Sequence, residues 1–502
     1  MFRFRIPIDK EVHAAVAVGM LAAMTGISFA IDAMGAHGEE SGASSLQLQM
    51  GVTLSAAPAE TDRAATSPAQ RGSGPAGLVQ LASLALAAQP AIQFADARFR
   101  ADSERLEQAR GARRANVSGT LGYRREFADS GGTTPFRSAS GGLLLSIPVY
   151  RAQVDAGIGQ AQSQEDSSRS AVEEARQNIL FGVLDAYLSA AQADEESSLL
   201  EEERNVLLGQ RRINERRMEG GVGTRVEVME TSARTEAILA SMEATRSLYR
   251  SQLAELQRLS SFKVDRVARV QNRLPPLIVP MNVADAVAVA REKSSALARL
   301  GAALAAAKAG VEVQRAALTP TVDLVGNLDR SRFAFDGGTT LLPSAALGLQ
   351  VAIPLYTGGI ASARIREAQA FAEGAQAQLE DAIRSLETEL GKAYLDLQRA
   401  TEQWRIQVNV LATANAALEA TRKAFDAGAR SNIDLLNSQQ LTFSTRREVL
   451  HARVGVLLAQ VRILSLSSSL NLQTLAHLET AFDVPAQNSP AHDAPAAPRS
   501  TP

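Results

Sequence analysis

The sequence predicts an α+β fold made of two tandem copies of one unit, each with a pair of strands and a pair of very long helices. Three observations indicate this. Several short motifs recur at one spacing along the chain, four segments alternate between apolar and polar residues, and large apolar side chains recur every seven residues over long stretches. A recurrence at a fixed spacing is the signature of a repeated structural unit, so we expect the same elements in the same order in each copy.

The two copies are related by an offset of 206 or 207 residues. The matching segments are 131–134 with 337–340, 147–150 with 353–356, 186–188 with 393–395, and 218–228 with 425–435. One offset that drifts by a single residue over this distance is hard to obtain by chance. We therefore assign a first copy to residues 77–261 and a second copy to residues 282–482.

The N-terminal segment is typical of a secretory signal peptide. Arg3 and Arg5 precede an uncharged stretch, and the small residues Ser28 and Ala30 mark a cleavage position. Acidic residues near the start of the chain dilute its positive charge and leave a retained anchor as the alternative. We therefore expect an exported protein from which residues 1–30 are removed.

Three further segments have few residues that could enter a core. They are a low-complexity linker at 31–76, a Pro-rich linker between the copies at 262–281, and a tail at 483–502. Segments of this composition bury too little apolar surface to offset the entropy lost on ordering. We therefore expect the tail to be disordered.

Four segments are predicted strands, at about residues 115–125, 139–149, 320–330 and 345–355. In the last of them Leu347, Leu349 and Val351 alternate with Gly348 and Gln350. Alternation over about ten residues is typical of a half-buried strand and also suits an outer-membrane barrel. Seven of the 22 aromatic residues fall in the two strand-pair segments, where an interfacial girdle would lie. The alternative is a pair of soluble hairpins packed on a domain core.

Four strands cannot close a membrane barrel by themselves. The smallest such barrels have eight strands, and lipid does not tolerate an open strand edge. Two chains would supply eight strands and three would supply twelve. Because side chains fill the interior of an eight-stranded barrel, a conducting pore favours three or more chains.

The helices of the second copy carry a coiled-coil pattern. Large apolar residues recur every seven positions, at Leu390, Leu397, Trp404, Leu411, Leu418 and Phe425. After Gly428 the steps alternate between three and four residues, as at a and d positions. Residues 358–427 would form a helix on the order of 100 Å long. The pattern in the first copy is weaker, so its helices are predicted through the repeat.

The chain lacks the signals of catalysis, of metal binding and of nucleic-acid binding. Its 52 basic and 54 acidic residues give a formal charge of −2, whereas a nucleic-acid surface needs an excess of clustered basic residues. It has no cysteine, and its five histidines are scattered without the spacing of a metal site or a catalytic triad. We therefore predict no enzyme activity, no catalytic residue, no cofactor and no metal.

Together these features closely resemble the TolC family of outer-membrane channels. The most specific parts are residues 355–359 (Leu-Tyr-Thr-Gly-Gly) and two helical hairpin tips, at about 219–226 and 426–433. By this resemblance the protein is a homotrimer, with a twelve-stranded outer-membrane β-barrel continuous with a twelve-helix periplasmic α-barrel.

The resemblance also implies partners. These are a periplasmic adaptor (membrane fusion protein) and an inner-membrane ABC transporter or proton-driven pump. The tip residues expected to contact the adaptor are Gly220, Gly221, Val222, Ala427, Gly428 and Ala429. Gly221 and Gly428 are also expected to end their helices through left-handed caps.

A gate at the hairpin tips is a further implication of the resemblance. Arg430 falls on the family's gating arginine, Glu227 on its acidic partner, and Phe425 on a position usually held by Tyr. Because Phe lacks a hydroxyl group, the latch should depend more on the ion pair. Asp434 matches the first of two carboxylate rings at the entrance, and Asn437 takes the second position, so the cation filter should be weaker.

Two classes of function remain open. The first is an exit channel of a tripartite export system that conducts substrate passively, with type I protein secretion favoured and small-molecule efflux as the alternative. The absence of cysteine excludes an acylated N-terminus and favours the secretion branch. The second class is a structural periplasmic coiled-coil or adaptor protein. The alternating strands favour the channel, because an adaptor has no need of a lipid-facing surface.

Overall fold

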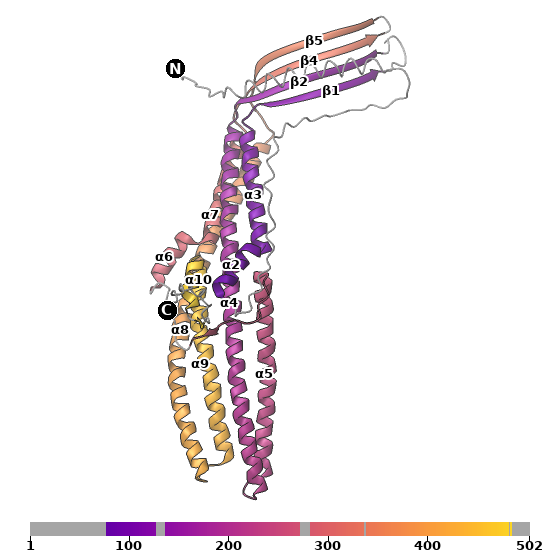
Figure 1. The fold of residues 1–502 in the computed structure, drawn as a ribbon. Helices are drawn as coiled ribbons and strands as arrows, with labels where there is room; N and C mark the ends of the chain where they lie inside the picture. The colour runs from indigo at the N-terminus through magenta and orange to yellow at the C-terminus, as the bar shows by residue number, and fades with distance from the viewer. Residues whose placement is uncertain (1–76, 127–135, 272–281, 336–337, 481, 484–502) are drawn as a thin grey trace, which may run out of the picture. The chain divides into compact units, whose positions relative to one another are not determined.

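The computed structural model describes residues 77–126, 136–271, 282–335, 338–480 and 482–483 (Figure 1). Its elements are α2 (Leu78–Ala88), α3 (Pro90–Gly111), β1 (Asn116–Glu126), β2 (Phe136–Tyr150), α4 (Ala152–Glu219), α5 (Arg225–Ser260), β3 (Arg269–Val270), α6 (Val283–Lys293), α7 (Ser295–Ala316), β4 (Thr321–Phe335), β5 (Gly338–Ala352), α8 (Ile360–Asp426), α9 (Asn432–Leu466), α10 (Leu472–Glu479) and β6 (Phe482–Asp483).

The same order of elements occurs twice along the chain. Helices α2, α3, α4 and α5 correspond to α6, α7, α8 and α9, with a strand pair at the middle of each series. The lengths of corresponding helices are 11 and 11, 22 and 22, 68 and 67, and 36 and 35 residues. The predicted tandem repeat is therefore confirmed. At 1.5 Å per residue, α4 and α8 are each about 100 Å long.

Three strands are longer than the sequence pattern indicates. β2, β4 and β5 each have 15 residues, because strand pairing continues beyond the alternating segments. Backbone hydrogen bonds depend little on the side chain, so Ser, Gly and Arg extend a ladder that hydropathy alone does not reveal.

The predicted ends and linkers lie largely outside the described residues. This holds for the signal peptide (1–30), the linker at 31–76, residues 272–281 and residues 484–502. The first part of the expected Pro-rich linker contains β3, which pairs antiparallel with β6 where the tail was expected to begin. The short ladder joins Arg269 to Asp483 and Val270 to Phe482.

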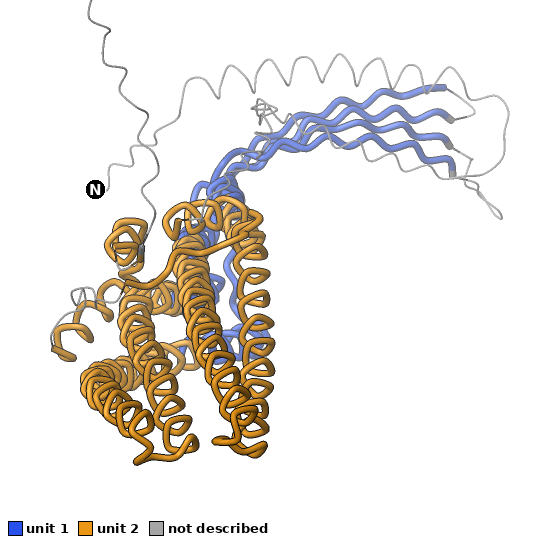
Figure 2. The backbone as a smooth tube through the Cα atoms, turned by 60° about the horizontal axis from the view of Figure 1, so that its bottom comes forward, with its two compact units in different colours: residues 1–67, 104–162, 306–372 blue, residues 68–103, 163–305, 373–502 orange. Residues whose placement is uncertain are grey.

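The chain divides into two compact units (Figure 2). Unit 1 comprises residues 1–67, 104–162 and 306–372, and unit 2 comprises residues 68–103, 163–305 and 373–502. The sheet of β1, β2, β4 and β5 belongs to unit 1. Unit 2 contains the tips of the helical hairpins α4–α5 and α8–α9. It also contains the short helices α2, α6 and α10.

The sheet of unit 1 has the order β1-β2-β4-β5 and is antiparallel throughout. β2 of the first copy pairs with β4 of the second, so the repeat builds one continuous sheet. A register shift between Pro148 and Tyr150 interrupts this ladder near the ends of the strands. There Arg151 forms a bidentate ion pair with Asp323, at 2.7 and 2.8 Å, which joins the two copies a second time.

The register separates two faces of this sheet, because residues paired across antiparallel strands share a face. The apolar face includes Val117, Leu121, Tyr123, Leu143, Leu145, Ile147, Val322, Leu324, Leu328, Leu341, Leu347, Leu349 and Val351. The opposite face includes Asn116, Ser118, Thr120, Ser138, Ser140, Ser146, Asp323, Asn327, Asp329, Ser344 and Gln350. These are the two sets that the alternation in the sequence assigns to opposite sides.

The core of unit 2 lies where α2 and α10 pack on the long helices. Tyr187 is fully buried there, and its ring meets that of Phe482 edge to face at 5.1 Å between centroids. Its hydroxyl oxygen accepts a hydrogen bond of 3.0 Å from the backbone N–H of Ala268. Burial raises the pKa of Tyr187 to about 12. The short ladder of β3 and β6 is thereby fixed to α4.

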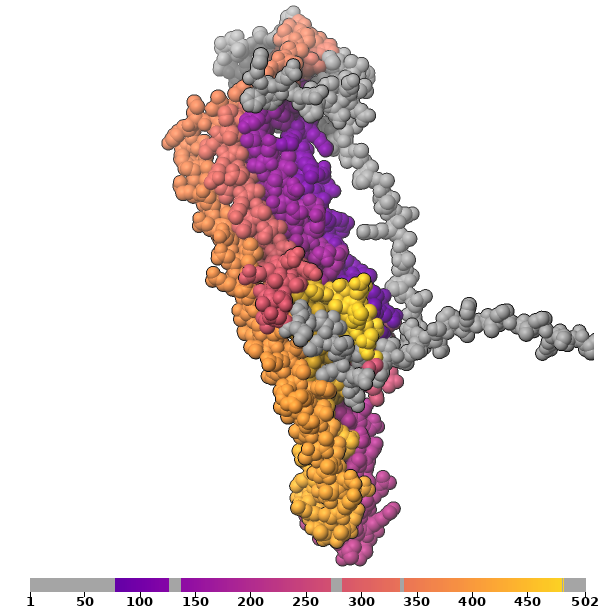
Figure 3. Space-filling model, turned by 90° about the vertical axis from the view of Figure 1, so that its left-hand side faces the viewer, coloured from indigo at the N-terminus to yellow at the C-terminus, as the bar shows by residue number. Residues whose placement is uncertain are grey.

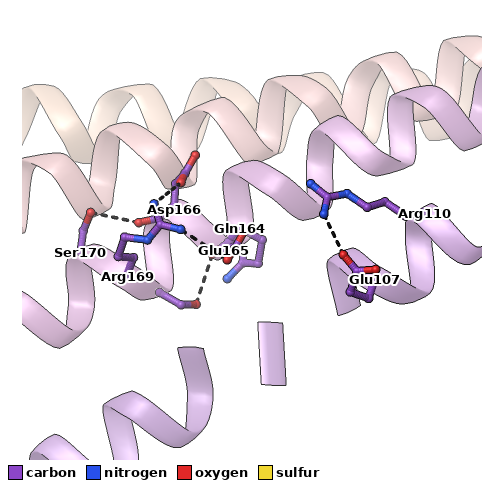
Figure 4. A network of polar contacts seen from close by, with 8 residues as sticks. Glu107, Arg110, Gln164, Glu165, Asp166, Arg169 and Ser170 are labelled. Carbon is purple, nitrogen blue, oxygen red and sulfur yellow. Dashed lines mark hydrogen bonds and ion pairs between the residues drawn. The ribbon is translucent and has the colours of Figure 1, made fainter. Parts of the chain in front are cut away.

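Ion pairs along the helices add small increments of stability. In unit 2, Arg169 lies 3.4 Å from Glu165 and 3.6 Å from Asp166, and in unit 1 Arg110 lies 2.7 Å from Glu107 (Figure 4). Exposed pairs at this spacing contribute about 0.3–0.5 kcal/mol each. They support helices whose stability comes mainly from packing.

Among the described residues, α9 is the one single helix that is long and apolar enough to cross a membrane by length and composition, and the bent pair of α2 and α3 passes the same test together. More than half of the apolar window of α9, 56%, is buried inside the protein. Core helices pass the same test, and α9 supplies many of the buried residues of unit 2. We therefore treat α9 as a core helix.

Candidate functional site at the hairpin tips

The tips of the two helical hairpins lie together at one end of unit 2 (Figures 1 and 3). Each long helix ends with a glycine in the left-handed region, Gly221 and Gly428, both with φ of +74°. The next residue closes the helix with a hydrogen bond five residues back, from Val222 N–H to Arg217 O and from Ala429 N–H to Ala424 O. A Cβ atom is disfavoured at such a φ, so glycine is the residue that suits these two positions.

The returning helices begin with matching capping boxes, a signal that the sequence reasoning missed. In α5, Glu227 N–H donates to the hydroxyl of Thr224 at 3.3 Å, and the Glu227 carboxylate accepts from Thr224 N–H at 3.0 Å. Ser431 and Asp434 form the same pair of contacts in α9, at 3.3 and 3.1 Å. The pattern Ser/Thr-x-x-acid before a helix identifies such a start.

The two predicted gate charges, Arg430 and Glu227, are not brought together among the described residues. Arg430 lies 3.9 Å from Asp434 of its own tip, and the Glu227 carboxylate is occupied by its cap. Hydrogen bonds from Ser431, and then the charge of Arg430, lower the pKa of Asp434. A link between Arg430 and Glu227 therefore stays a prediction.

Phe425 joins the two hairpins. Its side chain is buried, and the guanidinium carbon of Arg217 lies 4.9 Å from its ring centroid. Contacts within about 6 Å of a ring face are attractive because the ring quadrupole faces the cation. A tyrosine at this position could form a hydrogen bond through its hydroxyl group. Phe425 instead makes a cation–π contact with Arg217 of α4.

Asn437 lies on the surface of α9 and is paired with α5. Its side-chain oxygen accepts a hydrogen bond of 2.7 Å from Arg234, which also donates to Gln440 at 2.7 Å and to the carbonyl of Leu436 at 3.3 Å. The sequence reasoning missed Arg234, because nothing in its local pattern indicates a partner some 200 residues away.

A buried polar cluster lies in the first few turns of the helices next to the tips. Gln210 donates to Asn214 and to Asn432, each at 3.0 Å, and Asn214 donates to Thr231 at 3.0 Å. All four residues are buried, so these hydrogen bonds act in surroundings of low dielectric. The cluster joins α4, α5 and α9. In the sequence, the signal that could have revealed this cluster is a polar residue at a helix position that faces the core.

Farther from the tips, basic side chains of α9 form ion pairs with carboxylates of α4. The pairs are Arg446 with Glu202 at 2.8 Å, Arg447 with Glu203 at 2.6 Å, His451 with Glu196 at 3.2 Å, and Arg453 with Glu195 at 2.6 Å. Arg453 is 2% exposed and Glu203 is buried. The hydrogen bond to Glu196 raises the pKa of His451, and the same bond lowers the pKa of Glu196.

The predicted adaptor-contact residues are accessible. Gly220, Gly221, Ala427, Gly428 and Ala429 are exposed, and Val222 is 73% exposed. A cavity of about 370 Å³ lies elsewhere on unit 2, between α8 and α9, and has Ala, Gly and Leu with charged residues among its lining. Within the described part of the chain, no group of three or more His, Asp or Glu side chains could hold a metal ion.

Each of the two copies therefore contains a strand pair and a helical hairpin with a glycine at its tip. The model of the family "outer membrane efflux protein" matches residues 81–261 and 286–468, and the chain belongs to that family. By this membership the protein is assigned to the outer membrane.

Relatives with known names include secretion and efflux proteins. The alkaline protease secretion protein AprF of Pseudomonas aeruginosa is 28% identical over 313 residues, which cover 61% of this chain and 64% of that protein. TolC of Escherichia coli K12 is 22% identical over 336 residues, which cover 64% and 68%. The match to AprF thus spans less than two thirds of that protein's length.

Solved structures share the fold. The channel CusC superposes with a TM-score of 0.70 at 16% identity, over 84% of this chain and 99% of that one. The outer-membrane channel OprN gives 0.70 at 18% identity, over 79% and 90%. At such identities the likeness concerns the fold alone.

Proposed function

We propose that three copies of this chain form the outer-membrane exit channel of a tripartite export system. The trimer has a twelve-stranded barrel and a twelve-helix periplasmic tunnel, and conducts substrate passively from an inner-membrane transporter and a periplasmic adaptor. The chain's own role is a conduit without catalysis. The adaptor contacts the exposed tips at Gly220–Val222 and Ala427–Ala429.

The observation that carries this proposal is the sheet with two open edges. Among the described residues, β1 and β5 each have a neighbouring strand on one side only. Lipid does not tolerate such edges, because no water is present to satisfy their N–H and C=O groups. Pairing β5 of one copy with β1 of the next removes every edge, and three copies leave an interior wide enough to conduct.

The exposed apolar side chains of β5 agree with a lipid-facing surface. Leu347 is 71% exposed and Leu349 is 69% exposed. Largely exposed apolar side chains of this kind are unfavourable in water and indicate a membrane or a partner. A soluble periplasmic coiled-coil protein would have no use for such a face, so this observation also weighs against the structural alternative.

For the cargo, we favour protein secretion. AprF is named for alkaline protease secretion, and PrtF of Dickeya chrysanthemi, 27% identical over 322 residues, for protease secretion. The alternative is small-molecule efflux, supported by the efflux protein BepC of Brucella suis, which is 23% identical over 384 residues. In such a machine the inner-membrane transporter selects the cargo.

Deleting the gene tests the cargo. Culture-supernatant proteins and sensitivity to dyes, detergents and antibiotics are compared in the same strain with and without the gene. Loss of a few large secreted proteins with unchanged drug tolerance supports the secretion duct. Increased sensitivity with unchanged secretion supports efflux. A soluble monomer in the periplasmic fraction, in place of a trimer in the outer-membrane fraction, would contradict the channel itself.

The gate is a second part of the proposal. Around a threefold axis, three Asp434 carboxylates concentrate negative potential in a narrow, low-dielectric throat and favour cations. Arg430 offsets part of this charge in its own tip, and in the trimer it reaches Glu227 of a neighbouring hairpin. Phe425 holds the two hairpins together, and Asn437 leaves the second ring uncharged.

Arg430→Ser should raise single-channel conductance in planar bilayers, because it removes both the latch and the cation beside Asp434. Arg422→Ser, an exposed arginine of α8 near the same tip, is the control and should conduct as the wild type does. Glu227→Gln retains a capping side chain and removes only the charge, so it tests the link to Glu227. Unchanged conductance in Arg430→Ser would show that the gate is assigned wrongly.

A further inference from the structure

Charged side chains on the four-stranded sheet are sorted by sign between its two faces. β1, β2, β4 and β5 contain five arginines and three acidic residues. The cross-strand register places the acidic residues Asp323 and Asp329 on the polar face. Four of the five arginines share a face with the leucines and valines: Arg125, Arg137, Arg330 and Arg332.

The four arginines are neighbours. Arg125 is the direct cross-strand partner of Arg137. Arg332 pairs with Ala139, two residues from Arg137 on the same face, and Arg330 pairs with Gly141. Directly opposite side chains are about 5 Å apart at Cβ and diagonal ones about 7–8 Å. The residues of β2 that face Arg332 and Arg330 are the small residues Ala139 and Gly141.

The arginines lie at one level of the sheet, toward the β1–β2 and β4–β5 connections. On β4, Arg330 is eight residues beyond Val322, the first apolar residue of the face. At about 3.4 Å per residue this is about 27 Å along the strand, or about 21 Å in height for a strand tilted by about 40°. The apolar band of an outer-membrane barrel is about 25 Å tall, so the arginines lie at its outer edge.

Arginine is costly on a lipid-facing surface except at this level, where its long stem lies along the apolar surface and its charge reaches the headgroups. A guanidinium group binds phosphate in a bidentate manner and with five N–H donors. The two acidic residues of these strands whose side chains the structure describes lie on the other face, so the arginines form a basic cluster that would face the outer leaflet.

We propose that Arg125, Arg137, Arg330 and Arg332 form a binding site for the phosphate groups of an outer-leaflet glycolipid, the phosphorylated sugar headgroup of lipopolysaccharide. The site lies on the outside of the sheet, away from the conducted cargo. It rests on the apolar face of the sheet being the lipid-facing one, as in the proposed channel. It anchors a lipid at the surface where β2 and β4 join the two copies.

The experiment titrates purified lipopolysaccharide into the detergent-solubilised full-length protein and measures the bound lipid per chain. A dephosphorylated form of the same glycolipid and an excess of inorganic phosphate are the comparison ligands. The wild type should bind the phosphorylated glycolipid, bind the dephosphorylated form at least tenfold more weakly, and lose bound lipid as salt increases. Equal binding of the two glycolipids, or complete competition by inorganic phosphate at millimolar concentration, would overturn the site.

The sheet supplies a matched control variant. Arg124 adjoins Arg125 at the same level but lies on the polar face, opposite Ser138. The pair Arg330→Gln and Arg332→Gln should lower the apparent affinity by an order of magnitude or more, because one basic residue near an anionic lipid surface contributes about a fivefold factor. Arg124→Gln should leave the affinity unchanged. An equal loss in both variants, or no loss in either, would contradict the assignment.

Two further measurements separate a binding defect from a folding defect and from failure of the channel proposal. Arg330→Lys with Arg332→Lys retains charge but not bidentate geometry, and should bind with intermediate affinity. The oligomeric state of each variant is measured in the same samples. A wild type that forms trimers but binds no lipopolysaccharide refutes the lipid site alone, whereas a wild type that forms no trimer refutes the channel.

Discussion

Helices α4 and α8 occupy the same place in the two copies and differ by one residue in length. Equivalent side chains on the two helices nevertheless differ in how far they are exposed. Leu188 of α4 is 2% exposed, whereas Leu395, its equivalent at an offset of 207, is 67% exposed. Farther along, Glu201 and Glu203 of α4 correspond to Val408 and Val410 of α8, which are 39% and 40% exposed. The first copy thus carries charge where the second carries uncovered apolar surface.

This difference indicates which helix faces another molecule. α4 finds its partners inside the chain, through the buried core and the cations of α9. α8 leaves apolar side chains exposed that nothing in the described part of the chain covers, among them Leu395, Val408 and Val410. Exposed apolar surface can mark an interaction surface, and in the proposed trimer these side chains would pack on the adjacent copy. If the chain forms the proposed trimer, the two equivalent helices have diverged, α4 toward packing within the chain and α8 toward packing between chains.

The largest expected effect concerns the ion pairs that α9 makes with these two helices. Glu195→Ala removes the carboxylate beside Arg453, which is 2% exposed, and should lower stability by about 3 kcal/mol, because the buried cation loses its counter-charge. Glu389→Ala breaks the exposed pair with Arg462, whose side chains are both 49% exposed, and should cost less than about 1 kcal/mol. Denaturant unfolding of the solubilised protein measures both. Equal losses would mean that α9 is bound equally by α4 and α8.

The equivalent leucines give the next largest effect. Leu188→Ala should destabilise the folded chain by about 2–4 kcal/mol, because it leaves a cavity in the core. Leu395→Ala should leave the folded monomer within about 0.5 kcal/mol of the wild type, because its side chain is largely exposed, but should weaken association between chains. Unfolding midpoints and the concentration at which the oligomer dissociates distinguish the two. A Leu395→Ala protein with unaltered association would remove α8 from the interface.

The smallest effect is a pH dependence of the α4–α9 contact. His451 has a folded pKa raised by Glu196, so its contribution to stability is full below the unfolded pKa of about 6.5 and is lost as pH rises through the folded pKa. The folded pKa of Glu196 is lowered, so its contribution is lost as pH falls into the acid range. The pair is partly exposed, so solvent screening keeps the effect below about 1 kcal/mol.

Melting curves at pH 5.5 and pH 8.5 measure this contribution. The wild type should gain more stability at pH 5.5, relative to pH 8.5, than the variant His451→Gln, which does not titrate. A variant with the same pH dependence as the wild type would assign the titration to other groups. Glu389→Ala breaks the pair with Arg462 and retains both His451 and Glu196, so it should leave the difference unaltered.

Much of the fold could be predicted from the sequence because its signals are local or periodic. The offset of 206 to 207 residues predicts the repeat, and the two-residue period predicts which strand residues share a face. Gly221 and Gly428 mark the helix ends because few other residues adopt their φ. The capping boxes at Thr224 and Ser431 were equally readable as Ser/Thr-x-x-acid patterns and were missed. The strand ends were underestimated because pairing extends beyond the apolar alternation.

The contacts of the candidate site could not be predicted in the same way. Arg430 lies beside Asp434 of its own tip, Asn437 is paired with Arg234, and Phe425 packs under Arg217. The last two are contacts between hairpins. Residues about 200 positions apart meet only through the packing of two hairpins, and the heptad pattern of one helix does not specify the register of another.

The sequence by itself determined the repeated elements, the faces of the strands and the turns at the hairpin tips, because each depends on a residue and its near neighbours. Only the tertiary structure decided that Leu188 of α4 is buried while the equivalent Leu395 of α8 is exposed, and that four arginines from three strands form one cluster. Both depend on cross-strand register and on helix packing. These are set by many weak contacts acting together, and no single segment of the sequence contains them.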